Sequence, residues 1–346
     1  MTADFVVMSR MLSSMPIRVS LEGVTGVILA AGLGQRMGKV GLYVPKPLLP
    51  ALNCPIVGWN IALMRQYNIR DVVLNTHHLA AAFDTLPTAA GSAGTTITLL
   101  REAELSGPFG GVLACSAAAR KTDNLVVLAG DGIYETDFKN MIETHRLHGA
   151  ELTIGTASVS HGSRYGVLEI DEYGIVKAMR EKPPGVGYVS TASCGVYIVS
   201  PNLIAKMNTA RRPLDWVDVV HSLLDEGFIV ASHPVDRWMD AGTPEDLLKL
   251  NMEMLSDKYL HLVAREAGAT CNASVWLQGE SNVSDAKLDG TVLIGDGATL
   301  ESDAVVQDSI IGSQARIGKR AEIRNSVVLP GAVVPEDSTV FDAIVM

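Results

Sequence analysis

Several charged residues in this 346-residue chain are of the types that a phosphate-handling site requires. A glycine-rich stretch, LAAGLGQRMG, contains Arg36, and Lys46 follows ten residues later between two prolines. Lys182 lies in the sequence EKP, while Asp131 and Asp240 lie in GDG and WMDAGT. Basic side chains bind phosphate oxygens, and carboxylates bind the Mg²⁺ that accompanies them. Arg36 and Lys46 flank the same loop in a chain otherwise short of positive charge, so we predict a phosphate-binding site there.

The glycine-rich stretch follows an apolar run, VTGVILA, that is typical of a buried strand. Gly32 and Gly34 would allow backbone N–H groups to approach a polyphosphate, although such a turn also forms for purely geometric reasons. A P-loop is excluded because Leu33 stands where its first glycine is required and Val40 where Ser or Thr is required. A dinucleotide-binding fingerprint is excluded as well, because Asn53 occupies the place of its acidic residue.

Composition limits the partners that we expect. The net charge is −10, which disfavours the broad basic face that nucleic acids and anionic membranes require. The four cysteines are too far apart for a zinc site or a redox dithiol, and no apolar run approaches the ~20 residues of a membrane span. We expect a cytoplasmic protein whose partners are small phosphorylated molecules, with no nucleic-acid or membrane partner.

The elements that must position these residues follow an α/β pattern. We predict a flexible N-terminal extension over 1–23, a catalytic domain over 24–260 with a Rossmann-like, mixed or parallel sheet, and a third segment over 265–346. Residues 151–197 contain strands and turns. The predicted buried strands are 24–30, 71–75, 96–100 and 124–129, and the predicted helices are 55–67, 110–120 and 244–260.

The third segment has a strict periodicity. Aliphatic residues recur at steps of 6, 6 and 5, so that the pattern repeats every 17 residues. A helix would place residues six apart on different faces, and hairpin strands would alternate with period 2. A hexapeptide step therefore predicts a parallel β-helix with three flat sides and one inward aliphatic residue on each side. The inward positions are Ile294, Leu300, Val306, Ile311, Ile317, Ile323, Val328, Val334 and Val340.

At this point the chain resembles the sugar nucleotidylyltransferases (NDP-sugar pyrophosphorylases). The glycine-rich stretch and PKP match their opening motif, and five further segments resemble family motifs in the same order: FGGVL, GD, YGV with EKP, GVY and WMDAGT. The resemblance covers about residues 24–255. It implies a nucleotidyltransferase domain followed by a left-handed β-helix, similar to mannose-1-phosphate guanylyltransferases and to cyclitol-phosphate guanylyltransferases.

The resemblance also implies the reaction and the roles. A sugar-1-phosphate oxygen would attack the α-phosphorus of an NTP and expel pyrophosphate, with Arg36, Lys46 and Asp131 as catalytic residues. Mg²⁺ would be the cofactor, held by Asp131 and Asp240. With Arg36, Lys46 and Lys182 these aspartates would surround one crevice in which the two anions meet. The implied nucleotide-binding residues are Leu29, Ala30, Ala31, Gly32, Gly34, Glu102, Gly110, Gly111 and Asp131. The implied substrate-binding residues are Gly166, Glu181, Lys182, Ser193, Gly195 and Asp240.

The departures from the family fall where base and sugar would be chosen. Gln35 replaces Thr or Ser, Phe109 replaces Thr, and Ser193 replaces Asn. These changes favour an unusual acceptor such as a cyclitol phosphate. GTP is the favoured nucleotide because family members with this tail are often guanylyltransferases, and TTP and ATP remain open.

Other interpretations remain. Asp131 could be a turn residue, and Asp240 could serve the cap of the helix after it. A non-catalytic regulatory or sensor subunit of the same fold would be expected to have lost Arg36, Lys46 or an aspartate. An acyltransferase tail would need a histidine base, and residues 265–346 contain none. The β-helix is then most simply an oligomerisation module, which predicts a homo-oligomer.

Overall fold

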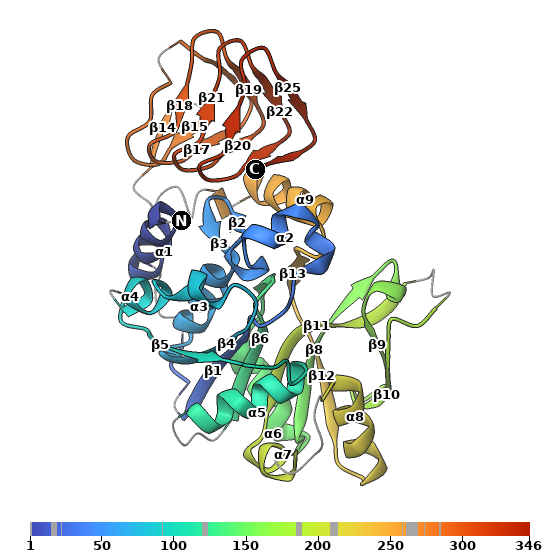
Figure 1. The fold of residues 1–346 in the computed structure, drawn as a ribbon. Coiled ribbons are helices and arrows are strands. Elements are labelled where there is room, and N and C mark those ends of the chain that lie inside the picture. The colour runs from blue at the N-terminus through green and yellow to red at the C-terminus, as the bar shows by residue number, and fades with distance from the viewer. Residues whose placement is uncertain are drawn as a thin grey trace.

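The chain folds into an α/β body and a triangular coil of short strands stacked above it (Figure 1). Within the parts described, no helix has the length and apolarity that crossing a bilayer requires. The computed structural model describes residues 2–14, 19–21, 23–91, 93–119, 124–184, 189–207, 214–257, 259–260, 269–272, 274–283 and 285–346.

A mixed sheet in the order β10-β9-β11-β6-β1-β4-β5 forms the centre of the body, and β8 and β12 extend it beside β11. Strands β6, β1, β4 and β5 are parallel, and β11 runs antiparallel to β6. The predicted α/β fold class is therefore confirmed. The parallel strands are β1 (Val24–Leu29), β4 (Asp71–Thr76), β5 (Thr96–Arg101) and β6 (Asn124–Ala129), within a residue of the predicted bounds. The others are β8 (Leu152–Val159), β9 (Gly166–Ile170), β10 (Val176–Glu181), β11 (Ser190–Val199) and β12 (Val230–Pro234).

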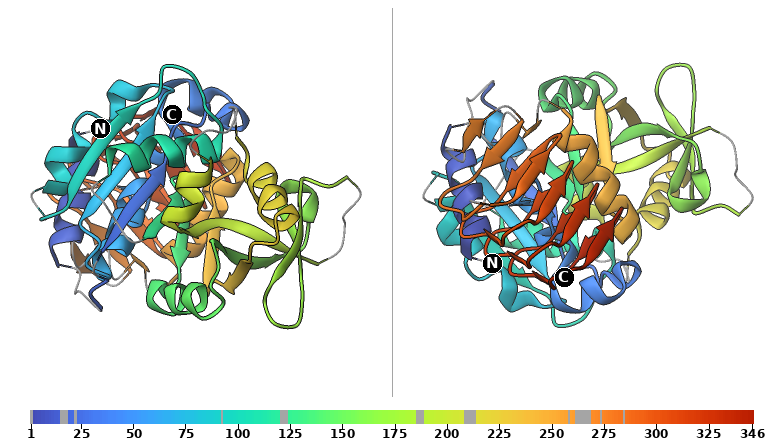
Figure 2. Two further views of the ribbon diagram at one scale, coloured as in Figure 1. Left: turned by 90° about the horizontal axis from the view of Figure 1, so that it is seen from below. Right: turned by 90° about the horizontal axis from the view of Figure 1, so that it is seen from above.

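Helices cover both faces of the sheet because successive strand residues point to opposite sides. In β1, Val27 belongs to one apolar core and Ile28 to the other. One core contains α3 (Ile56–Gln66) and α6 (Phe138–Leu147). The other contains α5 (Pro108–Ala118), α7 (Pro201–Met207) and α8 (Trp216–Asp225). Seen from below and above, the lobe built by β9 and β10 projects to one side (Figure 2).

Short elements surround the edge of the sheet where its parallel strands end. Strand β7 pairs antiparallel with β13, and β2 pairs with β3 in a tight hairpin. Helix α9 begins at Pro244, where the Thr243 hydroxyl accepts from the Asp246 N–H. The bounds are η1 (Gln35–Met37), α2 (Lys39–Tyr43), η2 (Lys46–Leu48), β2 (Pro50–Ala51), β3 (Cys54–Pro55), η3 (Ala80–Phe83), α4 (Leu86–Gly91), β7 (Gly132–Glu135), η4 (Gly162–Arg164), β13 (Arg237–Asp240) and α9 (Pro244–Leu255).

The N-terminal segment differs from the flexible extension that we predicted over 1–23. It forms α1 (Thr2–Ser14), which packs against α3, α4 and β3. The side chains of Met8, Met11 and Leu12 are fully buried. The apolar residues of this helix recur at helical spacing and so form one apolar face. For the described residues 2–14, the structure therefore has a packed helix in place of the predicted flexible extension.

The C-terminal strands form the predicted β-helix. Three sheets make its sides, and their strands pair in parallel except β14, which is antiparallel to β15. Residues 17 apart are direct partners, as for Ile294 and Ile311 or Leu300 and Ile317. The inward aliphatic residues make a core of their own. The strands are β14 (Thr270–Asn272), β15 (Val275–Leu277), β16 (Lys287–Asp289), β17 (Val292–Ile294), β18 (Thr299–Leu300), β19 (Val305–Gln307), β20 (Ile310–Ile311), β21 (Arg316–Ile317), β22 (Glu322–Arg324), β23 (Val327–Val328), β24 (Val333–Val334), β25 (Thr339–Phe341) and β26 (Ile344–Val345).

One side of the β-helix is docked on the catalytic domain. Leu293, Ile310 and Val327 point outward from the coil and join the core that contains the β2–β3 hairpin. At the tip of that hairpin, the Asn53 amide donates to Gln278 Oε1 at 3.1 Å and to the Ile311 carbonyl at 3.0 Å. The two parts therefore share an interface of apolar side chains and buried hydrogen bonds. Residues 261–264, between the two predicted domains, lie outside the described residues, so the exact boundaries stay predictions.

We expect the hairpin to depend on the fully buried Asn251 of α9. Its Oδ1 accepts from the Leu52 N–H at 2.9 Å, and its Nδ2 donates to the Pro50 carbonyl at 3.0 Å. Asn251→Ala leaves both backbone groups unpaired, at ~1–3 kcal/mol each, so the thermal unfolding midpoint should fall by several degrees. Lys249→Ala is the matched control on the same helix, because Lys249 is exposed there. Equal midpoints for the two variants would contradict this role.

Candidate active site

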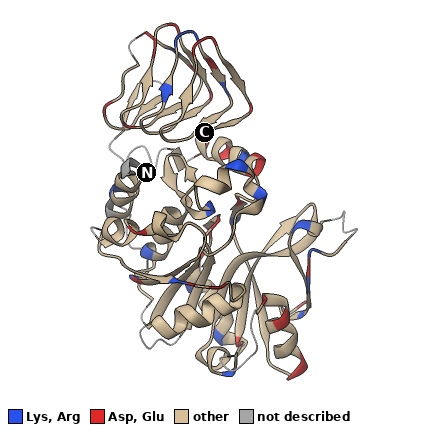
Figure 3. Cartoon of the chain, in the orientation of Figure 1, with Lys and Arg blue, Asp and Glu red and all other residues tan. Residues whose placement is uncertain are grey.

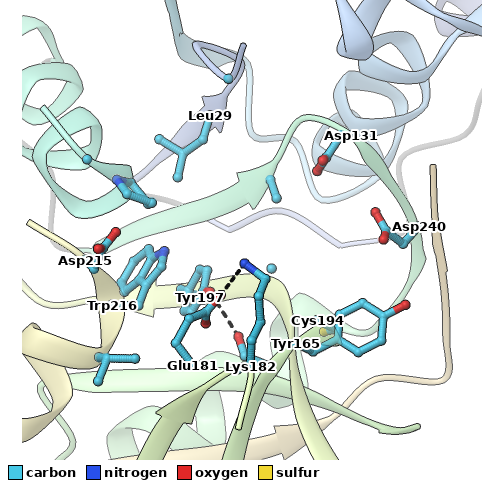
Figure 4. Close-up of a pocket in the computed structure, with 18 of the residues that line it drawn as sticks. Leu29, Asp131, Tyr165, Glu181, Lys182, Cys194, Tyr197, Asp215, Trp216 and Asp240 are labelled. Atoms are coloured by element: carbon cyan, nitrogen blue, oxygen red, sulfur yellow. Dashed lines mark hydrogen bonds and ion pairs between the residues drawn. The ribbon is translucent and has the colours of Figure 1, made fainter. Parts of the chain in front are cut away.

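A cavity of about 670 Å³ opens where β1 and β6 end and the β9–β11 lobe begins (Figure 4). It has the size of an ordinary small-molecule site. A second cavity, of about 530 Å³, shares Leu29, Gly32, Arg36 and Asp131 with it and continues along the glycine-rich loop. Together they are lined by most of the predicted residues: Leu29, Ala30, Ala31, Gly32, Gly34, Arg36, Lys46, Glu102, Asp131, Gly166, Glu181, Lys182, Ser193, Gly195 and Asp240.

The loop after β1 presents its arginine to both cavities. Gly34 has a φ of 65°, a left-handed conformation that suits glycine, and it caps η1. Arg36 lies in η1, is exposed, and has no hydrogen bond or ion pair with any residue that the structure describes. Its guanidinium is therefore available for an anion in the shared cavity.

Two carboxylates meet beside the loop because β7 and β13 pair antiparallel. The register places Asp240, the last residue of β13, opposite Gly132, and Asp131 directly precedes that glycine. Lys46 is 8% exposed and forms a salt bridge with Asp131, and its Nζ lies 3.7 Å from Asp240 Oδ1. The lysine therefore bridges two negative charges that would otherwise repel each other.

Burial makes the Asp240 carboxyl harder to ionise. Desolvation raises the pKa of Asp240 to about 6, and the nearby charge of Asp131 adds to the rise while Lys46 opposes it. One lysine faces two carboxylates, so negative charge remains in this partly buried site and favours the binding of a cation. Mg²⁺ commonly takes one or two protein carboxylates and completes its shell with water and phosphate oxygens. The two aspartates fit that donor set, although the described residues contain no cluster of three or more His, Cys, Asp or Glu side chains able to enclose a metal.

The segment around Glu102 is fixed by hydrogen bonds to its neighbours. Asn75, near the end of β4, accepts from the Ala30 N–H at 2.8 Å and donates to Glu102 Oε1 at 2.5 Å. The other Glu102 oxygen accepts from the Ser106 hydroxyl at 2.5 Å. Asn75 thus ties the glycine-rich loop to the Glu102 segment. Gly110 and Gly111 do not line either cavity; they lie buried in the first turns of α5.

The opposite wall of the cavity belongs to the β9–β11 lobe. Lys182 Nζ lies 2.7 Å from Glu181 Oε1, and both side chains are half exposed at the end of β10. The Ser193 hydroxyl forms a hydrogen bond within its own strand, since it lies 2.9 Å from the Tyr197 hydroxyl. Gly195 has a φ of 87°, and a Cβ there would lie 2.8 Å from Ala129 Cβ, so the strand approaches β6 closely.

Lys and Arg residues are scattered over the chain (Figure 3), and few of them reach the cavities. Arg36, Lys46 and Lys182 do so as predicted, and Arg164 is the addition. The Arg164 guanidinium is paired with Asp246 of α9, so it orders the wall and is already neutralised. The five side chains that we predicted around one crevice are thus brought together in adjoining cavities.

Several lining residues escaped the sequence reasoning. Tyr165, Tyr197 and Trp238 lie within the quoted motifs but were given no role. Asp215 and Trp216 lie in a stretch without a motif, so only the packing of α8 against β10 reveals them. The one signal in this stretch is that Asp215, a residue type that often caps helices, stands directly before the aromatic Trp216.

Comparison with known proteins found a matching family for each part of the chain. Residues 25–257 match the family described as nucleotidyl transferase. Residues 258–345 match the family described as GlmU-like, C-terminal hexapeptide, which identifies the coil as the left-handed β-helix of hexapeptide repeats. The first match covers more than half of the chain.

Among the relatives, a UTP–glucose-1-phosphate uridylyltransferase of Synechocystis sp. is 26% identical over 91% of this chain and 90% of its own length. A mannose-1-phosphate guanylyltransferase catalytic subunit beta of Drosophila pseudoobscura is 30% identical over 66% of this chain and 61% of its own length. A crystal structure of a putative glucose-1-phosphate thymidylyltransferase from Bacillus anthracis is 23% identical, with a TM-score of 0.58 over 66% of this chain and 94% of that chain. It shows the fold of the body.

Gly111 should tolerate no side chain, because a Cβ there would lie 2.5 Å from Asn75 Nδ2 and 3.3 Å from Glu102 Oε1. We expect Gly111→Ala to displace the Asn75 amide, at ~1–3 kcal/mol for overpacking a filled site, and to lower the thermal unfolding midpoint. Gly91→Ala is the control, since its Cβ would meet nothing within 4 Å. A midpoint unchanged in both variants would show that the Asn75–Glu102 link is dispensable.

Proposed function

We propose that this chain, which belongs to the nucleotidyl transferase family, joins an NTP to a phosphorylated sugar or cyclitol and releases pyrophosphate. It is a sugar-1-phosphate nucleotidyltransferase in the broad sense, as its relatives are. The observation that carries the proposal is the meeting of Arg36, Lys46, Lys182 and two aspartates around adjoining cavities.

The reaction requires two anions to meet in line. An oxygen of the acceptor phosphate attacks the α-phosphorus, a new P–O bond forms, and the bond from the α-phosphorus to the bridging oxygen breaks as pyrophosphate leaves. Positioning and charge neutralisation supply most of the catalysis in such transfers. In our proposal Arg36 donates to the triphosphate and to the leaving pyrophosphate, and Lys182 holds the acceptor phosphate.

Lys46 has a more specific part in this proposal. The resemblance to the family implies that it lies toward the α-phosphate, and in the structure its Nζ contacts the two carboxylates. We infer that it holds Asp131 and Asp240 together before substrates arrive. These two aspartates would hold Mg²⁺, which when bound neutralises charge on the triphosphate and draws the reacting groups together.

The remaining nucleotide-binding residues divide between the loop and α5. Backbone groups of Leu29, Ala30, Ala31, Gly32 and Gly34 would face the triphosphate, because their loop lines the second cavity. Glu102 would lie beside the base. We propose a supporting role for Gly111, since the absence of a side chain there allows α5 to approach Asn75 and Glu102 closely.

GTP is the nucleotide that we favour. Relatives named as mannose-1-phosphate guanylyltransferases cover up to 91% of this chain, and a relative named as a uridylyltransferase covers as much, which makes UTP a candidate beside TTP and ATP. For the acceptor, Gly166, Glu181 and Gly195 would contact the ring. Ser193 supports the wall through Tyr197, which leaves its hydroxyl less free to replace an asparagine amide.

We also propose a homo-oligomer in the cytoplasm. One side of the β-helix is covered by the catalytic domain, so an oligomer would use the other sides or the body. A non-catalytic regulatory subunit is less well supported, because Arg36, Lys46, Asp131 and Asp240 are all present and gathered.

The direct test is pyrophosphate release with Mg²⁺, using GTP, UTP, TTP and ATP against mannose 1-phosphate, glucose 1-phosphate and myo-inositol 1-phosphate. We expect turnover with one nucleotide strongly preferred, and with GTP first. Omission of Mg²⁺ should abolish release. Absence of pyrophosphate from every pair would remove the enzymatic proposal, and preference for another nucleotide would correct only the base.

Substitutions in the crevice test the assignments. Arg36→Ala and Asp131→Asn should each lower kcat by ~10²–10³. The first removes a positive charge that would neutralise the triphosphate, and the second removes a carboxylate that would hold Mg²⁺. Circular dichroism checks that both variants remain folded, since Arg36 is exposed and Asn can keep a polar contact with Lys46 at position 131. Arg180→Ala is the control, because Arg180 is exposed on β10 outside both cavities. Full turnover by either crevice variant would show that the catalytic assignment is wrong.

A further inference from the structure

The first residue of α8, Trp216, forms a rigid wall of the main cavity. Its ring stacks on Tyr197 with centroids 3.6 Å apart and 13° between the planes. Phe109 of α5 meets it edge-on, with centroids 5.1 Å apart and 78° between the planes. Because one face is covered by Tyr197 and the ring is only 8% exposed, the indole has a single fixed orientation.

The indole nitrogen of Trp216 is available to a molecule bound in the cavity. Trp216 lines the cavity, yet its indole N–H donates to no residue in the described part of the chain. An indole N–H that is largely enclosed usually has an acceptor. In Figure 4 the indole nitrogen is turned toward the open centre of the pocket. A group on a bound molecule would supply the missing acceptor.

Asp215 provides the complementary acceptor next to this donor. It occupies the N-cap position of α8, where an aspartate normally accepts from the first N–H groups of the helix, but its side chain makes no such bond. The carboxylate is exposed and lines the same cavity. Figure 4 places Asp215 and Trp216 together, across the pocket from Asp131 and Asp240.

We propose that Trp216 and Asp215 select the acceptor by binding two hydroxyl groups of its ring, on the side away from its phosphate. The indole N–H would donate to one hydroxyl oxygen, and the Asp215 carboxylate would accept from a neighbouring hydroxyl. This inference rests on the proposed function, because it assumes that the phosphate of the acceptor lies near Lys182 and the aspartates.

The pair predicts a class of acceptor. It fits a polyhydroxylated ring, a hexose or a cyclitol, with free hydroxyls at these positions. A ring that is deoxygenated or acylated there would leave the nearly buried indole N–H without this acceptor, and the Asp215 carboxylate would keep only water. Sites built to hydrogen-bond a hydroxyl discriminate strongly against analogues that lack it. Specificity would therefore come from α8, outside the glycine-rich loop and the carboxylate pair.

The test uses three variants of the full-length protein. Trp216→Phe keeps an aromatic ring on Tyr197 but removes the N–H, and Asp215→Asn removes the negative charge at an exposed position. Asp225→Asn is the matched control, because Asp225 is exposed at the other end of α8 and lines neither cavity. Steady-state kinetics are measured with whichever acceptor of the panel has the highest kcat/KM with the wild-type protein.

We expect the KM for the acceptor phosphate to rise ~10-fold in each of the first two variants, in line with the loss of one hydrogen bond in an enclosed site. The KM for the NTP should stay within twofold, and Asp225→Asn should match the wild type. A change in the KM for the NTP instead would overturn the inference by placing the pair at the nucleotide. Unchanged kinetics would overturn it as well.

Binding measurements separate this inference from the proposed reaction. Isothermal titration of mannose 1-phosphate, glucose 1-phosphate and myo-inositol 1-phosphate into the wild-type protein requires no turnover. Affinity that falls in Trp216→Phe and Asp215→Asn supports the pair even if pyrophosphate release is absent. No binding of any of the three to the wild type, or equal binding by all variants, would overturn it.

Discussion

The repulsion between Asp131 and Asp240 is the constraint on which the site depends. Antiparallel pairing of β7 with β13 brings the two carboxylates together, and burial makes the ionised form of Asp240 costly, which raises its pKa to about 6. The buried amine of Lys46 offsets that cost before any ligand is present. Removing one member of such a group leaves uncompensated charge in a partly dry place, which is expensive. The surrounding elements therefore have to hold Lys46 in position.

The β-helix contributes to that support. Lys46 begins η2, and the β2–β3 hairpin follows within a few residues. Asn251 of α9 forms a hydrogen bond with the backbone of the hairpin. The β-helix contacts the hairpin through Asn53 and an apolar interface. A module that the sequence suggested as a means of oligomerisation is thus part of the scaffold behind Lys46. The two roles are compatible, because Leu293, Ile310 and Val327, which join the core of the body, lie in one of its three sheets.

Predictions from the sequence succeeded where the physical signal is local. Continuous apolar runs marked β1, β4, β5 and β6 within a residue, because a strand buried on both faces needs them. The 17-residue period predicted the register of the β-helix, since each coil must return an aliphatic residue to the same inner side. Helix α1 was missed because its apolar residues are discontinuous in sequence and become a face only when wound at helical spacing.

The sequence by itself determined the kinds of residue that we propose for phosphate binding, their order along the chain and the repeat of the β-helix, because these depend on composition and short-range spacing. Tertiary structure alone decided which side chains meet. Lys46 and Asp240 are separated by almost two hundred residues, and their contact comes from the pairing of β13 with β7. The orientation of Trp216 likewise depends on Tyr197 and Phe109, which come from two other elements. Long-range packing sets such contacts, and no local pattern in the sequence encodes them.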